Sequence, residues 1–191
     1  MTRFATLLIG ILLSPMLLAA PVHYDIDQQK TGIVLSWRAF GGILSQAWLK
    51  DVTGKVTLDP DNEFNDQIQV TIPVATLVAS NSLLTWQLKS NMFFDAARYP
   101  TIAFISDRVV TLQKGHFRVF GVLDVREIRR PVILDVTLEE QSPSSLTLHA
   151  TTAISRLAFG LDRFALVVDD RIAIDINIGA HPQPGSANRP Q

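Results

Sequence analysis

Histidines, acidic pairs and serines are the residues that could do chemistry in this chain, and none of them forms a catalytic or metal-binding pattern. The four histidines are scattered, without the pair spacing of a metal site, at His23, His116, His149 and His181. Asp169 and Asp170 are adjacent acids of the kind usual on a solvated loop, and no serine stands in a nucleophile-elbow sequence. The chain has no cysteine, which excludes thiol catalysis and disulfides. We therefore predict that the protein is not an enzyme and holds no metal and no covalently bound cofactor.

Length and charge narrow the remaining classes. The chain has 191 residues, of which 47% are hydrophobic, so it can bury the core of one domain. Its formal net charge is −1, and no basic block occurs along it. A nucleic-acid-binding protein is expected to carry such a block, so nucleic acid is not a predicted partner.

The first 20 residues resemble an export signal. A short positive start at Arg3 precedes an apolar run that ends in Ala19 and Ala20. An uncleaved membrane anchor is the alternative, but the run is shorter than the roughly 20 residues of a spanning helix and contains Pro15. We predict a signal peptide over residues 1–20 and a periplasmic or secreted protein.

Beyond this segment the hydrophobic side chains alternate with period two, which is typical of half-buried antiparallel strands. In residues 33–39 the inward face carries Ile33, Leu35, Trp37 and Ala39. We interpret residues 48–58 as one strand that carries Trp48, Val52 and Val56 on its inward face, and residues 67–72 as a third strand. Further strands are predicted over residues 101–111, 115–125, 131–138, 146–155 and 171–178, with a turn at 127–130.

One segment breaks this alternation. Between residues 76 and 94, Leu84, Leu88 and Met92 follow at helical spacing, and Asn81 or Ser82 can cap the helix. Pro100 biases Tyr99 towards an extended backbone, so the next strand should start directly after it. The sequence thus predicts an all-β domain over residues 22–180 with a short helical insertion, and a flexible C-terminal tail over residues 181–191.

Eight antiparallel strands form either a sandwich or a barrel, and an eight-stranded barrel either fills itself with side chains or holds a small ligand. The predicted inward faces mix large residues with small ones, among them Gly54, Gly121, Ala150 and Thr152. The volume that small residues leave is open to neighbouring side chains or to a ligand.

Four stretches resemble, in order and spacing, the YceI-like family of exported lipocalin-like proteins that bind polyisoprenoid chains. The first is residues 88–95 with 99–106, which read Leu-Lys-Ser-Asn-Met-Phe-Phe-Asp and Tyr-Pro-Thr-Ile-Ala-Phe-Ile-Ser. The others are residues 24–27, residues 119–125 with Arg130-Pro131-Val132, and Ile154-Ser155-Arg156 with Phe159-Gly160. The resemblance covers residues 22–180 and implies an eight-stranded antiparallel lipocalin-like barrel around a bound polyisoprenoid, such as a quinone tail.

Such a ligand needs a dry, apolar lining, since each buried CH₂ contributes about 0.8 kcal/mol. The side chains that we expect to form the lining are Leu35, Trp37, Trp48, Val52, Val70, Leu88, Phe93, Phe94, Phe104, Val119, Leu123, Val136, Ile154, Phe164 and Ile174. Trp37 and Trp48 fit core packing equally well. Phe93 and Phe94 either line the mouth or fasten the helix to the barrel rim.

The sequence departs from the family pattern where a polar head group would be recognised. The family often carries three histidines at positions that correspond here to Lys30, Ala39 and Gln87. Arg38 and Arg156 are the remaining candidates for a polar contact, although an arginine on a strand is more often solvated or structurally paired.

Three functions from different classes follow. The first is a periplasmic carrier of an isoprenoid or similar lipid, with a hydrophobic small molecule as partner. The second is a ligand-free interaction module for a membrane-protein partner in stress response or respiration, which predicts a filled barrel and an exposed apolar patch. The third is a lipid hydrolase or isomerase, which would need a convergent acid, base or nucleophile. The resemblance also makes a homodimer reasonable.

Overall fold

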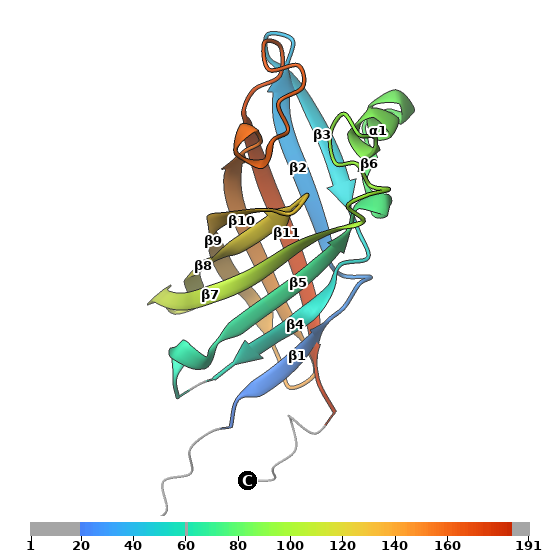
Figure 1. Ribbon diagram of the computed structural model, residues 1–191. Helices are drawn as coiled ribbons and strands as arrows, with labels where there is room; N and C mark the ends of the chain where they lie inside the picture. The colour runs from blue at the N-terminus through green and yellow to red at the C-terminus, as the bar shows by residue number, and fades with distance from the viewer. Residues whose placement is uncertain (1–19, 60, 185–191) are drawn as a thin grey trace, which may run out of the picture.

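The computed structural model describes residues 20–59 and 61–184, and in these residues the chain folds into one antiparallel sheet that closes on itself (Figure 1). The strands are β1 (Val22–Ile26), β2 (Gly32–Ala39), β3 (Ile43–Leu49), β4 (Thr53–Leu58), β5 (Gln67–Pro73), β6 (Val78–Ala79), β7 (Thr101–Gln113), β8 (His116–Val125), β9 (Ile128–Gln141), β10 (Leu146–Ser155) and β11 (Arg171–Pro182). The helices are α1 (Ser82–Lys89) and three short 3₁₀ turns, η1 (Glu63–Asn65), η2 (Val74–Thr76) and η3 (Leu157–Phe159).

The sheet closes because β1 pairs with β4 on one side and with β11 on the other. Strand β2 continues the course of β1 along β11, and β3 continues the course of β4, so each of these pairs is one bent strand of the wall. Counted in this way, the wall has eight antiparallel strands. The predicted eight-stranded barrel with one short helical insertion is therefore confirmed, and closure leaves few strand edges to protect.

The bend between β3 and β4 changes which side chains face inward. Leu49 and Val52 are both buried although they are three residues apart, so the alternation slips by one residue between them. Asp51 takes a left-handed conformation here, with φ of 53°. The Thr76 hydroxyl holds the bend, since it accepts from the Lys50 N–H at 3.1 Å and donates to the Lys50 carbonyl at 3.0 Å. The prediction of a single uninterrupted strand from residue 48 to 58 is therefore wrong.

Two further boundaries differ from the prediction. The turn expected at residues 127–130 is shorter, because Arg126 and Glu127 both take left-handed conformations and β9 already begins at Ile128. This backbone matches the tight two-residue turn that joins twisted antiparallel strands. At the C-terminus, β11 continues to Pro182, and His181 pairs with Asp25 of β1, so the predicted tail does not begin at residue 181. Residues 185–191 and the predicted signal peptide up to residue 19 lie outside the described residues.

The predicted helix, α1, begins directly after the predicted N-cap residue. The Asn81 side chain accepts from the Leu84 N–H at 2.8 Å, which makes Asn81 the N-cap of α1. The helix ends at Lys89, and β7 starts at Thr101, directly after Pro100. Within residues 20–59 and 61–184, no helix is both long enough and apolar enough to cross a membrane.

Candidate lipid-binding cavity

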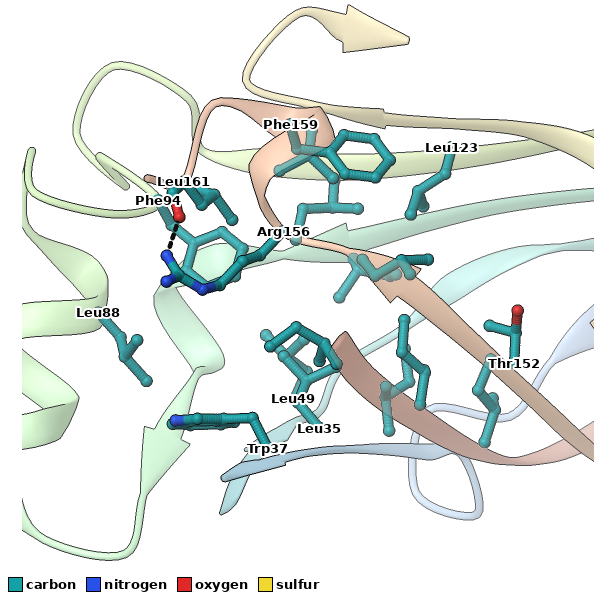
Figure 2. A pocket seen from close by; sticks show the side chains of 18 of the residues that line it. Leu35, Trp37, Leu49, Leu88, Phe94, Leu123, Thr152, Arg156, Phe159 and Leu161 are labelled. Atoms are coloured by element: carbon teal, nitrogen blue, oxygen red, sulfur yellow. Dashed lines mark hydrogen bonds between the residues drawn. The ribbon is translucent and has the colours of Figure 1, made fainter. Parts of the chain in front are cut away.

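The barrel encloses a cavity of about 650 Å³ that is lined almost wholly by apolar side chains. It is within the size range usual for ligand pockets. The predicted residues that line it are Leu35, Trp37, Val52, Val70, Leu88, Phe93, Phe94, Phe104, Leu123, Val136, Ile154, Phe164 and Ile174. Figure 2 shows Leu35, Trp37 and Leu88 around one open space, which β2 and α1 border from different sides. The barrel is therefore hollow along part of its length.

Two of the predicted lining residues lie elsewhere. Trp48 is 37% exposed and points away from the cavity, because the alternation slips between Leu49 and Val52. Val119 does point inward, but it is only 1% exposed and is packed into the filled part of the barrel, paired with the buried Val109 of β7. The prediction for Trp48 was wrong because the strand register differs from the expected one. The prediction for Val119 was wrong because the cavity does not extend to that residue.

Leu49 is the lining residue that the sequence reasoning missed in place of Trp48. The register of the β2–β3 hairpin could have identified Leu49. Strands β2 and β3 pair Ala39 with Ile43 and Ile33 with Leu49, so partners share a face across a tight turn. Once the inward face of β2 is assigned, a turn at Gly41 and Gly42 places Leu49 inward and Trp48 outward.

The small inward residues fill two different roles. Ala150 and Thr152 line the cavity and leave it volume. At Gly121, by contrast, a Cβ would lie 2.6 Å from the Phe104 ring, and at Gly54 it would lie 2.1 Å from the Gln69 carbonyl oxygen. Neighbouring groups therefore occupy the space that these two glycines leave.

Among the described residues, the cavity is closed at one end and open at the other. At the end near β1, its lining residues Ile26, Thr31 and Ile178 are all buried. At the other end the lining includes Phe40 and Phe164, which are 69% and 50% exposed. We call this opening the mouth, and it lies among the β2–β3 hairpin, α1 and the loop of residues 157–169 (Figure 1).

Helix α1 covers one side of the mouth. Leu84 and Leu88 lie on its inward face and line the cavity, whereas Trp86 points outward. The Phe93 ring, just after the helix, stacks on the Phe164 ring of the loop with 6.1 Å between ring centroids. Phe93 and Phe94 are both buried and both line the cavity, which is compatible with each of the two roles that the sequence left open.

Arg156 is the one charged residue among the described residues that line the cavity, and it is 3% exposed. Its guanidinium donates to backbone carbonyls of the following loop: Leu161, Arg163 at 3.0 Å, Val168 at 2.9 Å and Asp169 at 3.0 Å. Figure 2 shows this side chain at the edge of the cavity beside Phe94 and Leu161. Four of its five N–H donors are thus directed at the loop, so Arg156 holds the loop in place.

The other polar candidates do not gather into a head-group site. Arg38 is exposed, does not line the cavity and donates to the Gly42 carbonyl at 3.0 Å, which stabilises the hairpin turn. Of the three positions where the family often has histidine, Ala39 and Gln87 line the cavity and Lys30 is exposed. The cavity lining contains no carboxylate and no histidine among the described residues.

A carboxylate supports the loop from outside the cavity. The Asp170 carboxylate accepts from the Leu157 N–H at 2.9 Å and from the Ser155 hydroxyl at 2.8 Å. These two hydrogen bonds, the first of them foremost, hold the pKa of Asp170 below its usual value. Elsewhere, the described residues contain no group of three or more acidic or histidine side chains that could hold a metal ion.

Comparison with known proteins bears directly on this architecture. The family model for the YceI-like domain matches residues 24–180. The chain belongs to the YceI-like family. Among its YceI-like relatives, the UPF0312 protein plu2095 of Photorhabdus laumondii is 29% identical over 121 residues, which is 63% of this chain and 62% of that protein. Protein YceI of Salmonella newport is 27% identical over 64% of this chain and 65% of its own length. The matched region thus spans less than two thirds of these relatives.

Solved structures show the same YceI-like fold. BcnA of Burkholderia cenocepacia superposes with a TM-score of 0.75 at 21% identity, covering 81% of this chain and 99% of BcnA. A polyisoprenoid binding domain from Saccharophagus degradans, implicated in plant cell wall breakdown, superposes with a TM-score of 0.65 at 11% identity, covering 84% and 98%. At these identities the likeness establishes the barrel.

Proposed function

We propose that the protein is an exported carrier that holds a long isoprenoid chain, such as the tail of a quinone, inside its barrel. The observation that carries this proposal is the cavity of about 650 Å³, open at one end and lined by branched and aromatic side chains. Burial of the chain's CH₂ and CH₃ groups would supply the binding free energy, at about 0.8 kcal/mol per CH₂. Membership of the YceI-like family and the likeness to a polyisoprenoid binding domain support this choice of ligand.

The lining favours a cargo whose buried part carries no charge. Arg156 is committed to backbone carbonyls of the loop, and the rest of the polar lining consists of hydroxyl, amide and indole groups such as Thr152, Gln87 and Trp37. A charged group without a partner in such a site is strongly disfavoured. We therefore expect a neutral head group inside the cavity, or a charged one outside the mouth.

The two alternatives fit the structure less well. The interaction module predicts a filled barrel, whereas the barrel is hollow; its other prediction, an exposed apolar patch, does have a counterpart at the mouth. The lipid hydrolase or isomerase needs a general base or a nucleophile beside its substrate. The described cavity lining offers serine and threonine hydroxyls without a histidine or carboxylate to activate them.

Native mass spectrometry of the mature protein, purified from its own envelope, tests the carrier function. We expect a stoichiometric mass beyond the polypeptide, which organic extraction should identify as a polyprenyl compound or prenyl quinone. A bare polypeptide mass, under conditions in which a related carrier keeps its lipid, would instead support the interaction module.

Variants of the two phenylalanines test where the lipid binds. Phe93→Ala and Phe94→Ala remove rings that line the cavity, so both should lower the bound-lipid fraction while the barrel stays folded. Phe64→Ala is the control, since Phe64 is 82% exposed on η1 and does not line the cavity. If Phe93→Ala and Phe94→Ala lower only the melting temperature, with lipid occupancy unchanged, these rings fasten the helix and do not hold the ligand.

A further inference from the structure

Large apolar side chains surround the mouth on its outer side. They come from the tip of the β2–β3 hairpin, from exposed positions of α1 and from the loop of residues 157–169. We call this set the mouth rim, and its members are Phe40, Ile43, Leu44, Leu83, Trp86, Phe164, Leu166 and Val167, each between 39% and 101% exposed. Leu166, at the upper limit, is fully exposed.

The hairpin and the loop form one joined tip. The Phe40 N–H donates to the Val167 carbonyl at 2.6 Å, and the Asp169 N–H donates to the Arg38 carbonyl at 2.9 Å. Ala39 also forms an isolated antiparallel bridge with Val168. Figure 1 shows the two segments side by side beyond the end of the barrel wall. Their exposed side chains are therefore held in place by backbone hydrogen bonds, not carried on independent loops.

The rim and the cavity share one apolar surface. Phe40, Ile43, Leu44, Leu83 and Phe164 belong to the rim and also line the cavity. A hydrocarbon chain that leaves the cavity past these residues stays in contact with apolar side chains up to the outer edge of the protein. Such a path is expected where the cargo passes from the barrel directly into another apolar phase.

We propose that the mouth rim docks onto a lipid bilayer, with the joined tip in the boundary between head groups and acyl chains. The continuity with the cavity favours a bilayer as occupant, and so does the protrusion of Leu166. Docking itself does not require the proposed function. Only its purpose rests on that function, since a docked mouth would let the lipid cargo move into the bilayer without crossing water. The start of β1 and the end of β11 lie at the opposite end of the barrel, away from the docked surface (Figure 1).

The charge around the rim agrees with an anionic lipid surface. Residues 38–45, 80–90 and 157–169 contain three basic side chains, Arg38, Lys89 and Arg163, and two acidic side chains, Asp162 and Asp169. Their net charge is 3 − 2 = +1, whereas the full chain has −1. Basic residues near an apolar insertion face strengthen binding to anionic lipids.

Vesicle flotation tests the docking with the lipid-loaded protein as purified. The probe is vesicles of phosphatidylethanolamine and phosphatidylglycerol. The test variant is Phe40→Asp with Leu166→Asp, and the matched control is Phe64→Asp with Leu112→Asp, which adds the same two charges at exposed apolar positions away from the mouth. Phe40 has a φ of 47°, a conformation that aspartate tolerates better than phenylalanine, so the rim variant should fold.

We expect the wild type and the control variant to float with the vesicles and the rim variant to bind at least about tenfold more weakly, since two inserted apolar side chains are replaced by charges. Trp86 reports the contact independently: vesicles with brominated acyl chains should quench its fluorescence, and Trp86→Phe should remove most of that quenching. Equal vesicle binding by the rim variant and the control variant would overturn the proposal.

Two other outcomes separate the rim from the cargo. A wild type that does not bind vesicles but is a dimer, and becomes a monomer in the rim variant, would assign the rim to a second copy of the chain and overturn bilayer docking. Mass spectrometry of the same preparations tests the cargo separately. If the protein holds lipid but does not bind vesicles, the carrier function is supported and docking is rejected. If it binds vesicles but holds no lipid, docking is supported and the carrier function is rejected.

Discussion

The two ends of this barrel are built from the same strands but are closed in different ways. At the end near β1, side chains such as Tyr24, Val56 and Leu146 are 3% exposed or less and form a packed cluster. At the mouth, the wall gives way to α1, a hairpin tip and a loop, and several apolar side chains are exposed. The comparison shows that packed side chains on paired strands close one end, while the open end depends on a few specific contacts.

One side chain makes the main hydrogen bonds that hold the loop at the mouth. Arg156 reaches carbonyls at both the near and the far part of its loop, from Leu161 to Asp169. No comparable buried cation lies among the described core residues at the closed end, where the ladder hydrogen bonds of β1 with β4 and β11 bind the strands. The loop at the mouth is therefore expected to be more sensitive to one substitution than any single position in the closed end.

Loss of Arg156 should destabilise the protein more than any other single substitution at the mouth. Arg156→Ala leaves buried carbonyls of the loop without donors and removes a packed side chain, which we expect to lower the free energy of unfolding by about 3 kcal/mol or more. Urea unfolding followed by circular dichroism measures the change. Arg38→Ala is the matched control, because Arg38 is exposed and makes one bond to Gly42; it should cost less than about 1 kcal/mol. Equal losses of unfolding free energy in the two variants would show that Arg156 does not hold the loop in place.

An enlarged side chain distinguishes the filled end from the hollow one. Val119 is 1% exposed in the packed cluster, so Val119→Phe should overfill it and cost about 1 to 3 kcal/mol. Ile174 is half-buried against the cavity, so Ile174→Phe should be tolerated within about 1 kcal/mol and should reduce the lipid that the barrel holds. Thermal unfolding and native mass spectrometry of both variants supply the two readouts. A large destabilisation by Ile174→Phe would mean that this part of the barrel is packed.

The closed end and the walls could be predicted from the sequence because period-two alternation indicates directly which face is buried. Ile33, Leu35 and Trp37 all face inward as the pattern indicates. Prediction failed at the bend after Leu49, because a left-handed residue such as Asp51 shifts the alternation and no glycine marks the position. Alternation is a local signal, so it holds through a strand but not past such a bend.

The mouth could be predicted only in part. The helix follows from its N-cap and its spacing, and the family resemblance identified residues 154–160 as a unit. The sequence could not predict that Arg156 binds the carbonyls of its own loop. Every residue has a backbone carbonyl, so no residue type marks such an acceptor. The exposed tip at Phe40 and Leu166 also depends on the pairing of two segments far apart in the chain. Long-range contacts of this kind become visible only once the barrel is closed.

The smallest expected effect is a pH dependence with opposite sign at two sites, Asp170 at the mouth and Asp66 away from it. At the mouth, hydrogen bonds from Leu157 and Ser155 lower the pKa of Asp170. A lowered pKa stabilises the fold at pH above the ordinary value of an aspartate, and this contribution is lost as the pH falls through the lowered value. Asp170→Asn should therefore be less stable than the wild type at neutral pH, by less than about 1 kcal/mol because the group is exposed to solvent, and the difference should shrink as the pH falls below the ordinary pKa of an aspartate.

Asp66, next to β5 and away from the mouth, supplies the opposite case. Burial raises its pKa, although it accepts from the Asp59 N–H at 2.7 Å. A raised pKa stabilises the fold below the ordinary value, and this contribution is lost as the pH rises through the raised value. Relative to the wild type, Asp66→Asn should gain stability as the pH rises from about 3 to 7, whereas Asp170→Asn should lose it. Melting temperatures of the two variants over this range measure both slopes, and slopes of the same sign would contradict the assignment of burial at one site and hydrogen bonding at the other.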